Sequence, residues 1–133
     1  MTNPAAEQAE RTTSFELVVP PDAELLRVVR LVASGLASFT ALDLNAVEEV
    51  RVGADELVAT LMQASDGGPV TISFFATDDG VTISASTTMP NGAEFVLDPL
   101  TDRILNEVAD AHAWHTDGDR VHGRIDHALP TSS

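Results

Sequence analysis

The sequence predicts an α+β fold: a two-layer α/β sandwich in which a mixed, mostly antiparallel sheet has three helices on one face. The order of patterns along the chain supports this, because it runs strand, helix, helix, hairpin, helix, hairpin. Helices packed on one face of such a sheet would bury the apolar sides of both layers. The chain has 133 residues, of which 44% are hydrophobic, and this suits a single domain with a substantial core. We expect that domain at residues 14–129, between a disordered tail at 1–13 and a short tail at 130–133.

The first elements are a strand and a helix. Residues 14–21, SFELVVPP, alternate apolar and polar side chains as a strand does, and Pro20 and Pro21 are expected to end it. Asp22 is expected to cap a helix at residues 23–39. The inward side chains of the strand are predicted to be Phe15, Leu17 and Val19. Those of the helix are predicted to be Leu25, Val28 or Val29, Val32, Leu36 and Phe39.

A second helix is predicted at residues 44–64 from its helical spacing of apolar residues. Its inward side is predicted to comprise Leu44, Val47, Val50, Ala54, Leu57 or Val58, and Leu61. Its outer side is acidic, with Glu48, Asp55 and Glu56.

The rest of the chain is predicted to form two hairpins and a third helix. In order, these are a turn at 65–69, strands at 70–76 and 81–86, irregular chain at 87–99, a helix at 100–111, and a hairpin of 113–116 and 120–126 around 117–119. The inward side chains of the third helix are predicted to be Leu100, Ile104, Leu105, Val108 and Ala111.

The charge and composition narrow the functional classes. The formal net charge is −14, and all seven basic residues are arginines. A chain so acidic is unsuited to nucleic acid and to anionic membrane surfaces, which attract clustered basic residues. The absence of cysteine excludes disulfides and thiolate zinc sites. With no long apolar run and no signal peptide pattern, we expect a cytoplasmic protein.

The first two predicted helices include residues 25–60, LLRVVRLVASGLASFTALDLNAVEEVRVGADELVAT. Their lengths, the position of the break between them and their apolar spacing resemble the first two helices of one protein family. With the element order, they make the chain resemble the anti-sigma-factor serine kinases of the GHKL ATPase superfamily, which have the Bergerat fold. The resemblance covers roughly residues 14–129 and is greatest to the divergent stress-response anti-sigma factors of actinobacteria.

In that family the second helix has a glutamate that acts as general base toward a partner serine, and, four residues later, an asparagine that helps to hold Mg²⁺ on ATP. Glu56 stands at the glutamate and Thr60 at the asparagine. The adenine-binding motif Asp-x-Gly-x-Gly is also altered, because Thr87, Met89 and Asn91 replace its three fixed residues.

The family's phosphate-binding Gly-x-Gly is the third altered motif. It reads Leu97, Asp98, Pro99 here, so glycines are missing and a negative charge stands beside the phosphate position. Phosphoryl transfer depends on all these parts together. The resemblance therefore implies a degenerate kinase fold with no enzymatic activity and no ATP or Mg²⁺ cofactor, in which Glu56 is vestigial.

What remains of the family's activities is protein binding. The resemblance implies that the chain binds a sigma factor or its antagonist, with Arg30 at the position of the family's sigma-contacting arginine and Arg27 one turn before it. It also implies a homodimer, and residues 14–19 would offer an exposed sheet edge.

Two alternatives stay open. One is an active ATP- and Mg²⁺-dependent serine kinase acting on an anti-sigma-factor antagonist. The other is a small-ligand sensor that uses the former nucleotide pocket. That pocket would be lined by Thr60, Thr87, Met89 and Leu97.

Four histidines lie in the last 22 residues, and imidazole is a common metal ligand. They are His112, His115, His122 and His127. His112 is expected near a helix end and the other three on strands without a shared face, so no metal site is predicted.

Overall fold

The computed structural model describes residues 12–40 and 42–128. Most of the predicted N-terminal tail, the predicted tail at 130–133 and the last residue of the predicted domain lie outside the described residues. No helix in the described ranges has both the length and the apolar character needed to cross a membrane.

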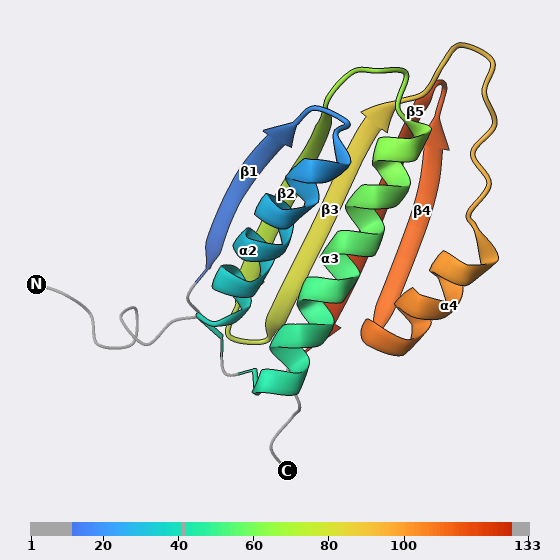
Figure 1. The fold of residues 1–133 in the computed structure, drawn as a ribbon. Coiled ribbons are helices and arrows are strands. Elements are labelled where there is room, and N and C mark those ends of the chain that lie inside the picture. Colours follow the sequence, from blue (N-terminus) through green and yellow to red (C-terminus); the bar gives the residue numbers. More distant parts are fainter. Residues whose placement is uncertain (1–11, 41, 129–133) are drawn as a thin grey trace, which may run out of the picture.

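One antiparallel sheet forms the back layer of the molecule (Figure 1). Its order is β1-β2-β3-β5-β4, and each neighbouring pair is antiparallel. The strands are β1 (Thr13–Val19), β2 (Val70–Thr77), β3 (Gly80–Thr88), β4 (Ala111–Asp117) and β5 (Arg120–Ala128). β1 and β4 are the edges, so the N-terminal strand lies at a sheet edge as predicted.

The helices of the described chain lie together on one face of the sheet, so the predicted two-layer α+β architecture is confirmed (Figure 1). They are the short 3₁₀ helix η1 (Ala23–Leu25), α2 (Leu26–Ala37), α3 (Leu44–Ala64) and α4 (Pro99–Val108). α2 packs on β2 and α3, and α3 crosses β3 and β5. α4 packs between α3 and β4, at the far end of the sheet from β1.

The core lies between the helices and the sheet. Alternate residues of β2 and β3 face it, and α3 faces them with Leu57, Val58 and Leu61. Phe74, at the middle of β2, is fully buried and stacks on Phe15 of β1 with ring centroids 5.0 Å apart. The predicted inward side of the first strand is confirmed in part: Val19 is buried and Leu17 packs against the core, whereas Phe15 stacks on Phe74 but is 38% exposed, because β1 is an edge strand.

The predicted helix ends needed correction. Phe39 and Leu44 were predicted inward, but they are 84% and 87% exposed. α2 ends at Ala37, so Phe39 lies in the following turn, and Leu44 is the first residue of α3, before that helix reaches the sheet. Leu100 is likewise exposed in the first turn of α4, and Ala111 belongs to β4 because the helix ends at Val108.

Aspartates set where the helices begin. The Asp22 carboxylate accepts a hydrogen bond from the Glu24 amide, and Asp43 caps α3 by accepting from the Ala46 amide at 2.8 Å. The segment after Asp22 starts as η1, so the predicted single helix at 23–39 becomes α-helical only from Leu26. α3 has the predicted bounds.

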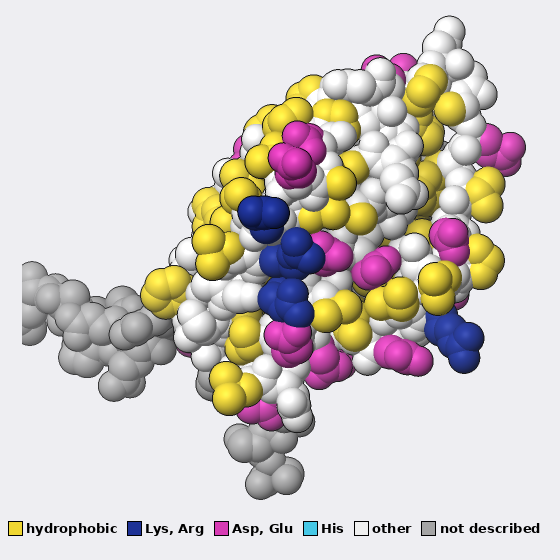
Figure 2. Space-filling view, viewed as in Figure 1, with side chains coloured by type: hydrophobic (Ala, Val, Ile, Leu, Met, Phe, Trp, Pro, Cys, Tyr) yellow, Lys and Arg dark blue, Asp and Glu magenta, His cyan; other side chains and the backbone are white. Residues whose placement is uncertain are grey.

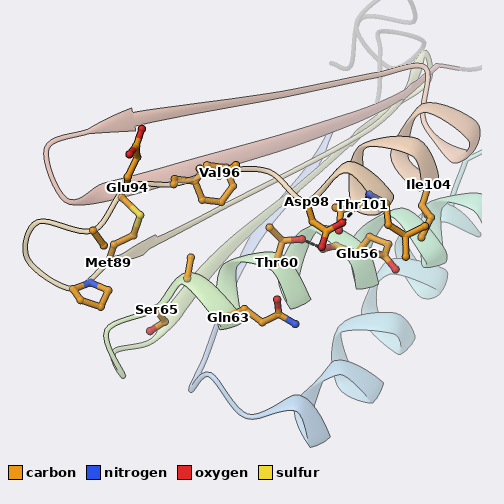
Figure 3. A pocket seen from close by; sticks show the side chains of 15 residues that line it. Glu56, Thr60, Gln63, Ser65, Met89, Glu94, Val96, Asp98, Thr101 and Ile104 are labelled. Carbon is orange, nitrogen blue, oxygen red and sulfur yellow. Dashed lines mark hydrogen bonds between the residues drawn. The ribbon is translucent and has the colours of Figure 1, made fainter.

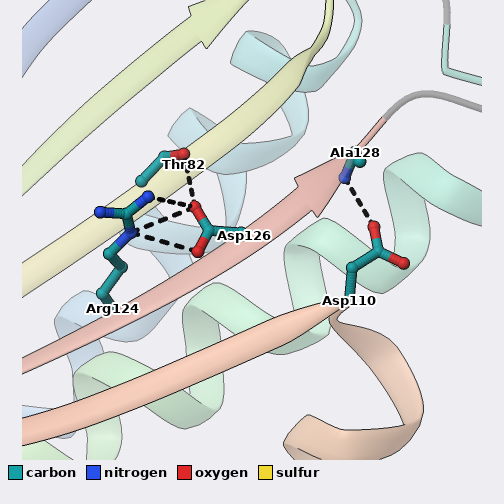
Figure 4. A network of polar contacts seen from close by, with 5 residues as sticks. All are labelled: Thr82, Asp110, Arg124, Asp126 and Ala128. Carbon is teal, nitrogen blue, oxygen red and sulfur yellow. Dashed lines mark hydrogen bonds and ion pairs between the residues drawn. The ribbon is translucent and has the colours of Figure 1, made fainter.

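Polar contacts fix the closing hairpin to the rest of the sheet (Figure 4). The Asp126 carboxylate of β5 accepts a hydrogen bond from the Thr82 hydroxyl of β3 at 2.7 Å and pairs with Arg124 at 2.9 Å. Asp110 accepts from the Ala128 amide at 2.6 Å, across the end of the β4–β5 pair. The hairpin is thereby tied to β3 and to the end of α4.

Candidate functional site

A cavity of about 490 Å³ lies between α3, the irregular chain at 89–98 and the start of α4 (Figure 3). Glu56, Thr60 and Met89 line it, so three residues that the family resemblance singled out meet at one place. The volume falls in the range of small-molecule sites, roughly 300–1,000 Å³.

Two predicted pocket residues are not part of its lining. β3 continues to Thr88, so Thr87 stays in the strand with its side chain fully buried, and its hydroxyl donates a hydrogen bond to the Pro69 carbonyl at 3.0 Å. Leu97 is half-buried in the connection but does not line the cavity. Of the four predicted residues, the structure therefore brings Thr60 and Met89 together.

Thr60 is held by its own helix. Its hydroxyl donates to the Glu56 carbonyl at 2.8 Å, the back-bond to the preceding turn that threonine often makes in helices. The Thr60 hydroxyl proton is therefore engaged within the helix and is not available to a ligand, although the hydroxyl oxygen can still accept a hydrogen bond.

The first turn of α4 is closed to an anion. Asp98 is its N-cap, and the Asp98 carboxylate accepts from the Leu100 amide at 2.7 Å. Pro99, the first helical residue, has no N–H to offer. A helix N-terminus binds phosphate through free amides and a positive dipole. Here a carboxylate already occupies that position.

Carboxylates line the cavity, and among residues 12–40 and 42–128 no arginine or histidine does. They are Glu56, Glu94 and Asp98. Burial raises the pKa of Glu56, and the negative charges of Asp55 and Asp98 raise it further, against a hydrogen bond from Thr101 that lowers it. The field in the cavity therefore disfavours a bound polyphosphate.

Replacing Glu56 with Gln is expected to stabilise the fold at neutral pH and to have little effect below about pH 4. The folded-state pKa of Glu56 is raised above its ordinary 4.5, so the folded protein favours the protonated side chain. The resulting contribution to the free energy of unfolding is fully present below pH 4.5 and is lost as the pH rises through the raised pKa. At neutral pH the wild type holds a desolvated charge that glutamine lacks. Melting temperatures of both proteins, measured from acid to neutral pH, check this.

The control is Glu107→Gln, which removes an exposed acid on α4 and reports what a smaller net charge does alone. Parallel melting curves for wild type and Glu56→Gln across the whole pH range would contradict the interpretation of Glu56.

Part of the cavity wall was missed from sequence. The segment 87–99 was predicted only as irregular, yet Phe95 stacks on Trp114 of β4 with centroids 5.4 Å apart, and this contact fixes the connection against the sheet. Asp98 as N-cap was also missed. An aspartate followed by a proline and then an apolar helical period is a known helix-start pattern, and it could have revealed this role.

The two predicted partner-binding arginines lie on α2, at the surface shared with α3. Arg30 lies 3.6 Å from the Asp55 carboxylate of α3, whereas Arg27 is exposed and forms no ion pair with any described residue. Arg51 of α3 pairs with Glu48 one turn before it. Figure 2 shows basic side chains gathered over these two helices, among hydrophobic and acidic ones. We call this the arginine face and define it by Arg27, Arg30, Arg51, Val28 and Leu31.

The histidines are dispersed. His115 and His122 stack across the β4–β5 pair with ring centroids 4.5 Å apart. His112 accepts a hydrogen bond from the Trp114 indole at 3.0 Å, and it lies in β4 rather than near a helix end as expected. His127 lies 3.9 Å from both Glu49 and Asp110. Over residues 12–40 and 42–128, no group of three or more potential metal ligands forms.

Two surfaces thus stand out on the described part of the chain: the acid-lined cavity beside α4, and the arginine face on α2 and α3. α2, which contributes to the arginine face, and α4, which contributes to the cavity, lie on opposite sides of α3 (Figure 1). Neither a scan against protein-family models nor a search of curated proteins finds a match to this chain.

Proposed function

We propose that this chain is a nucleotide-independent protein-binding regulator, resembling an anti-sigma factor, that binds a sigma factor or the antagonist of such a factor. The observation on which the proposal depends is the arginine face. An unpaired Arg27 stands on an exposed and partly apolar helix surface of a protein with a net charge of −14.

The arginine face has the composition of an interface. Arginine is favoured at interfaces for its planar donor fork and weak hydration. Leu31 is 74% exposed on the same helix, and Val28 adds to the apolar area. A partner segment that combines acidic and apolar side chains would match both properties. The acidic remainder of the surface would repel nucleic acid and favour basic segments elsewhere on a partner.

The cavity argues against the alternative of an active serine kinase. The capped start of α4, the missing Pro99 amide and the acidic lining all oppose a bound triphosphate. Thr60, in place of the metal-holding residue, donates its proton to its own helix. Calorimetry with ATP and Mg²⁺ distinguishes the two functions, since micromolar affinity would favour the kinase.

A small-ligand sensor is the second candidate function, and the cavity favours it. The space beside Glu56 and Met89 is large enough for a small molecule. Because α3 contributes both to the cavity and to the arginine face, a ligand could change partner affinity through this one helix.

A homodimer through the sheet belongs to the same proposal. β1 is an edge strand of the described sheet, and Val18 and Phe15 are exposed on it. An edge of this kind offers unpaired backbone groups to a second strand.

Charge reversal at Arg27 and Arg30 is expected to weaken partner binding at least about thirtyfold, or roughly 2 kcal/mol, as for an interface hot spot. The partner is first recovered from extract of the source cells by wild-type bait in EDTA, without nucleotide, and identified by mass spectrometry. Its affinity for wild type and for Arg27→Glu and Arg30→Glu is then measured by calorimetry. Arg27→Glu is the cleaner variant, because Arg30 also pairs with Asp55.

Arg103→Glu is the matched control, since it reverses the charge of an exposed arginine on α4. Wild-type affinity is expected for this variant. Equal loss in all three variants would show a general charge effect, and recovery of the partner only with ATP and Mg²⁺ would overturn nucleotide independence.

A further inference from the structure

Two carboxylates from different elements meet at one end of the cavity. Glu56 comes from α3 and Asp98 from the start of α4. Figure 3 shows them grouped with the side chains of Thr60 and Thr101, apart from Glu94, which projects from the connection. This end therefore presents two negative charges and two hydroxyl groups to whatever enters.

These charges have no cationic partner in the described chain. Neither Glu56 nor Asp98 forms an ion pair there, and no basic side chain of the described residues lines the cavity. Glu56 is partly buried, and its raised pKa reflects the cost of holding the charge there. The Leu100 amide and the Thr101 hydroxyl donate hydrogen bonds to these carboxylates, but a pair of like charges with no cation beside it is stabilised further by a positive group brought in from outside.

Apolar side chains stand next to the charged end. Leu100 is 63% and Val96 76% exposed at the cavity, and Met89 and Ile104 are deeper in its wall. Large apolar side chains left open beside a polar cluster are the usual lining of small-molecule sites. A ligand that covered Val96 and Leu100 would remove their area from water.

The described lining is unsuited to a bare metal ion or an anion. No group of three or more metal-ligating side chains forms among the described residues. The space of about 490 Å³ is also far larger than an ion needs. An anion would meet carboxylates and a capped helix start.

We infer that the cavity binds a small organic ammonium ion with an apolar body. The ammonium group lies between Glu56 and Asp98 and donates to them and to the Thr60 and Thr101 oxygens. The body covers Val96 and Leu100. The inference rests on the second candidate function, ligand sensing, and supplies the ligand class.

Three probes of one shape and different charge test this: phenethylammonium, 2-phenylethanol and phenylacetate. Each is titrated at neutral pH into the full ¹⁵N-labelled chain and followed by amide chemical shifts. We expect phenethylammonium to shift the amides of residues 56–60 and 96–101. It should bind at least roughly tenfold more tightly than the alcohol, as a charge-assisted hydrogen bond requires, and phenylacetate should not bind.

Variants locate the charge effect. Glu56→Gln keeps the shape of the side chain. It is expected to lower the affinity for phenethylammonium at least roughly tenfold and to leave the affinity for 2-phenylethanol unchanged. The exposed Glu107→Gln should match wild type. Equal affinity for all three probes, no binding of the ammonium, or an unchanged affinity in Glu56→Gln would each overturn the inference.

Failure of the sensor function is a separate outcome. Partner affinity is measured with and without saturating phenethylammonium. If the ammonium binds as expected and the affinity for the partner does not change, the assignment of the ligand class is supported and the sensor function is excluded. If Arg27→Glu binds the partner normally while the ammonium still binds, the arginine face is excluded and the cavity assignment is unaffected.

Discussion

Replacing Phe74 with Ala is expected to lower the free energy of unfolding by about 3–5 kcal/mol, the range for removing a large aromatic side chain from a packed core. Phe74 is fully buried at the middle of β2. It pairs with Phe15 on one side and Ile83 on the other, and it stacks on the Phe15 ring. The truncation would leave a cavity between sheet and helices that backbone pairing holds open. Urea unfolding followed by circular dichroism measures the loss.

The neighbouring Phe75 supplies a matched control. It has the same side chain on the same strand but lies exposed on the opposite face of the sheet. Phe75→Ala is expected to cost less than about 1 kcal/mol, as for most surface substitutions. Similar losses in both variants would contradict the placement of the core on the helical side.

The second large effect is expected at Gly123, where alanine should destabilise the fold by about 1–3 kcal/mol, as overpacking does. An added Cβ would lie 2.6 Å from the Trp114 ring and 2.7 Å from the Leu57 side chain. Gly123 thus lets Trp114 lie across β5 while α3 approaches the sheet. Trp114 is the single tryptophan, so its fluorescence reports any displacement of the ring alongside the unfolding curve.

Gly35→Ala is expected to have the opposite effect from Gly123→Ala and to stabilise the fold. Gly35 lies within α2, and apart from its own helix backbone an added Cβ meets no atom of the described residues within 4 Å. Alanine there should stabilise the helix by up to about 1 kcal/mol, because it restricts the unfolded chain. A neutral Gly123→Ala beside a stabilising Gly35→Ala would rule out the tight approach of Trp114 and Leu57.

The middles of the elements were predictable and their ends were less so. α3 has the predicted bounds because its apolar spacing is regular and Asp43 caps it. Phe39 and Leu44 repeat the same spacing but lie where the helices leave the sheet. Periodicity reports which direction a side chain points and not whether another layer stands opposite it.

The site was predictable in part for a similar reason. Glu56 and Thr60 are one turn apart on α3, so helical geometry alone brings them to the same wall. Thr87 was expected beside them, but β3 continues two residues beyond its predicted end and keeps Thr87 in the core. The position of Glu94 depends on how Phe95 packs on Trp114, a contact between distant segments that no local pattern encodes.

The arginine face affects how the protein approaches a charged partner before the two make contact. Three of the seven arginines stand together there, while the chain as a whole is strongly negative. Two of them are paired with carboxylates of α3, so the face is the least negative part of an acidic surface rather than a strongly positive one. An acidic docking segment would be repelled least on the α2 side, and added salt would screen the repulsion from the rest of the molecule.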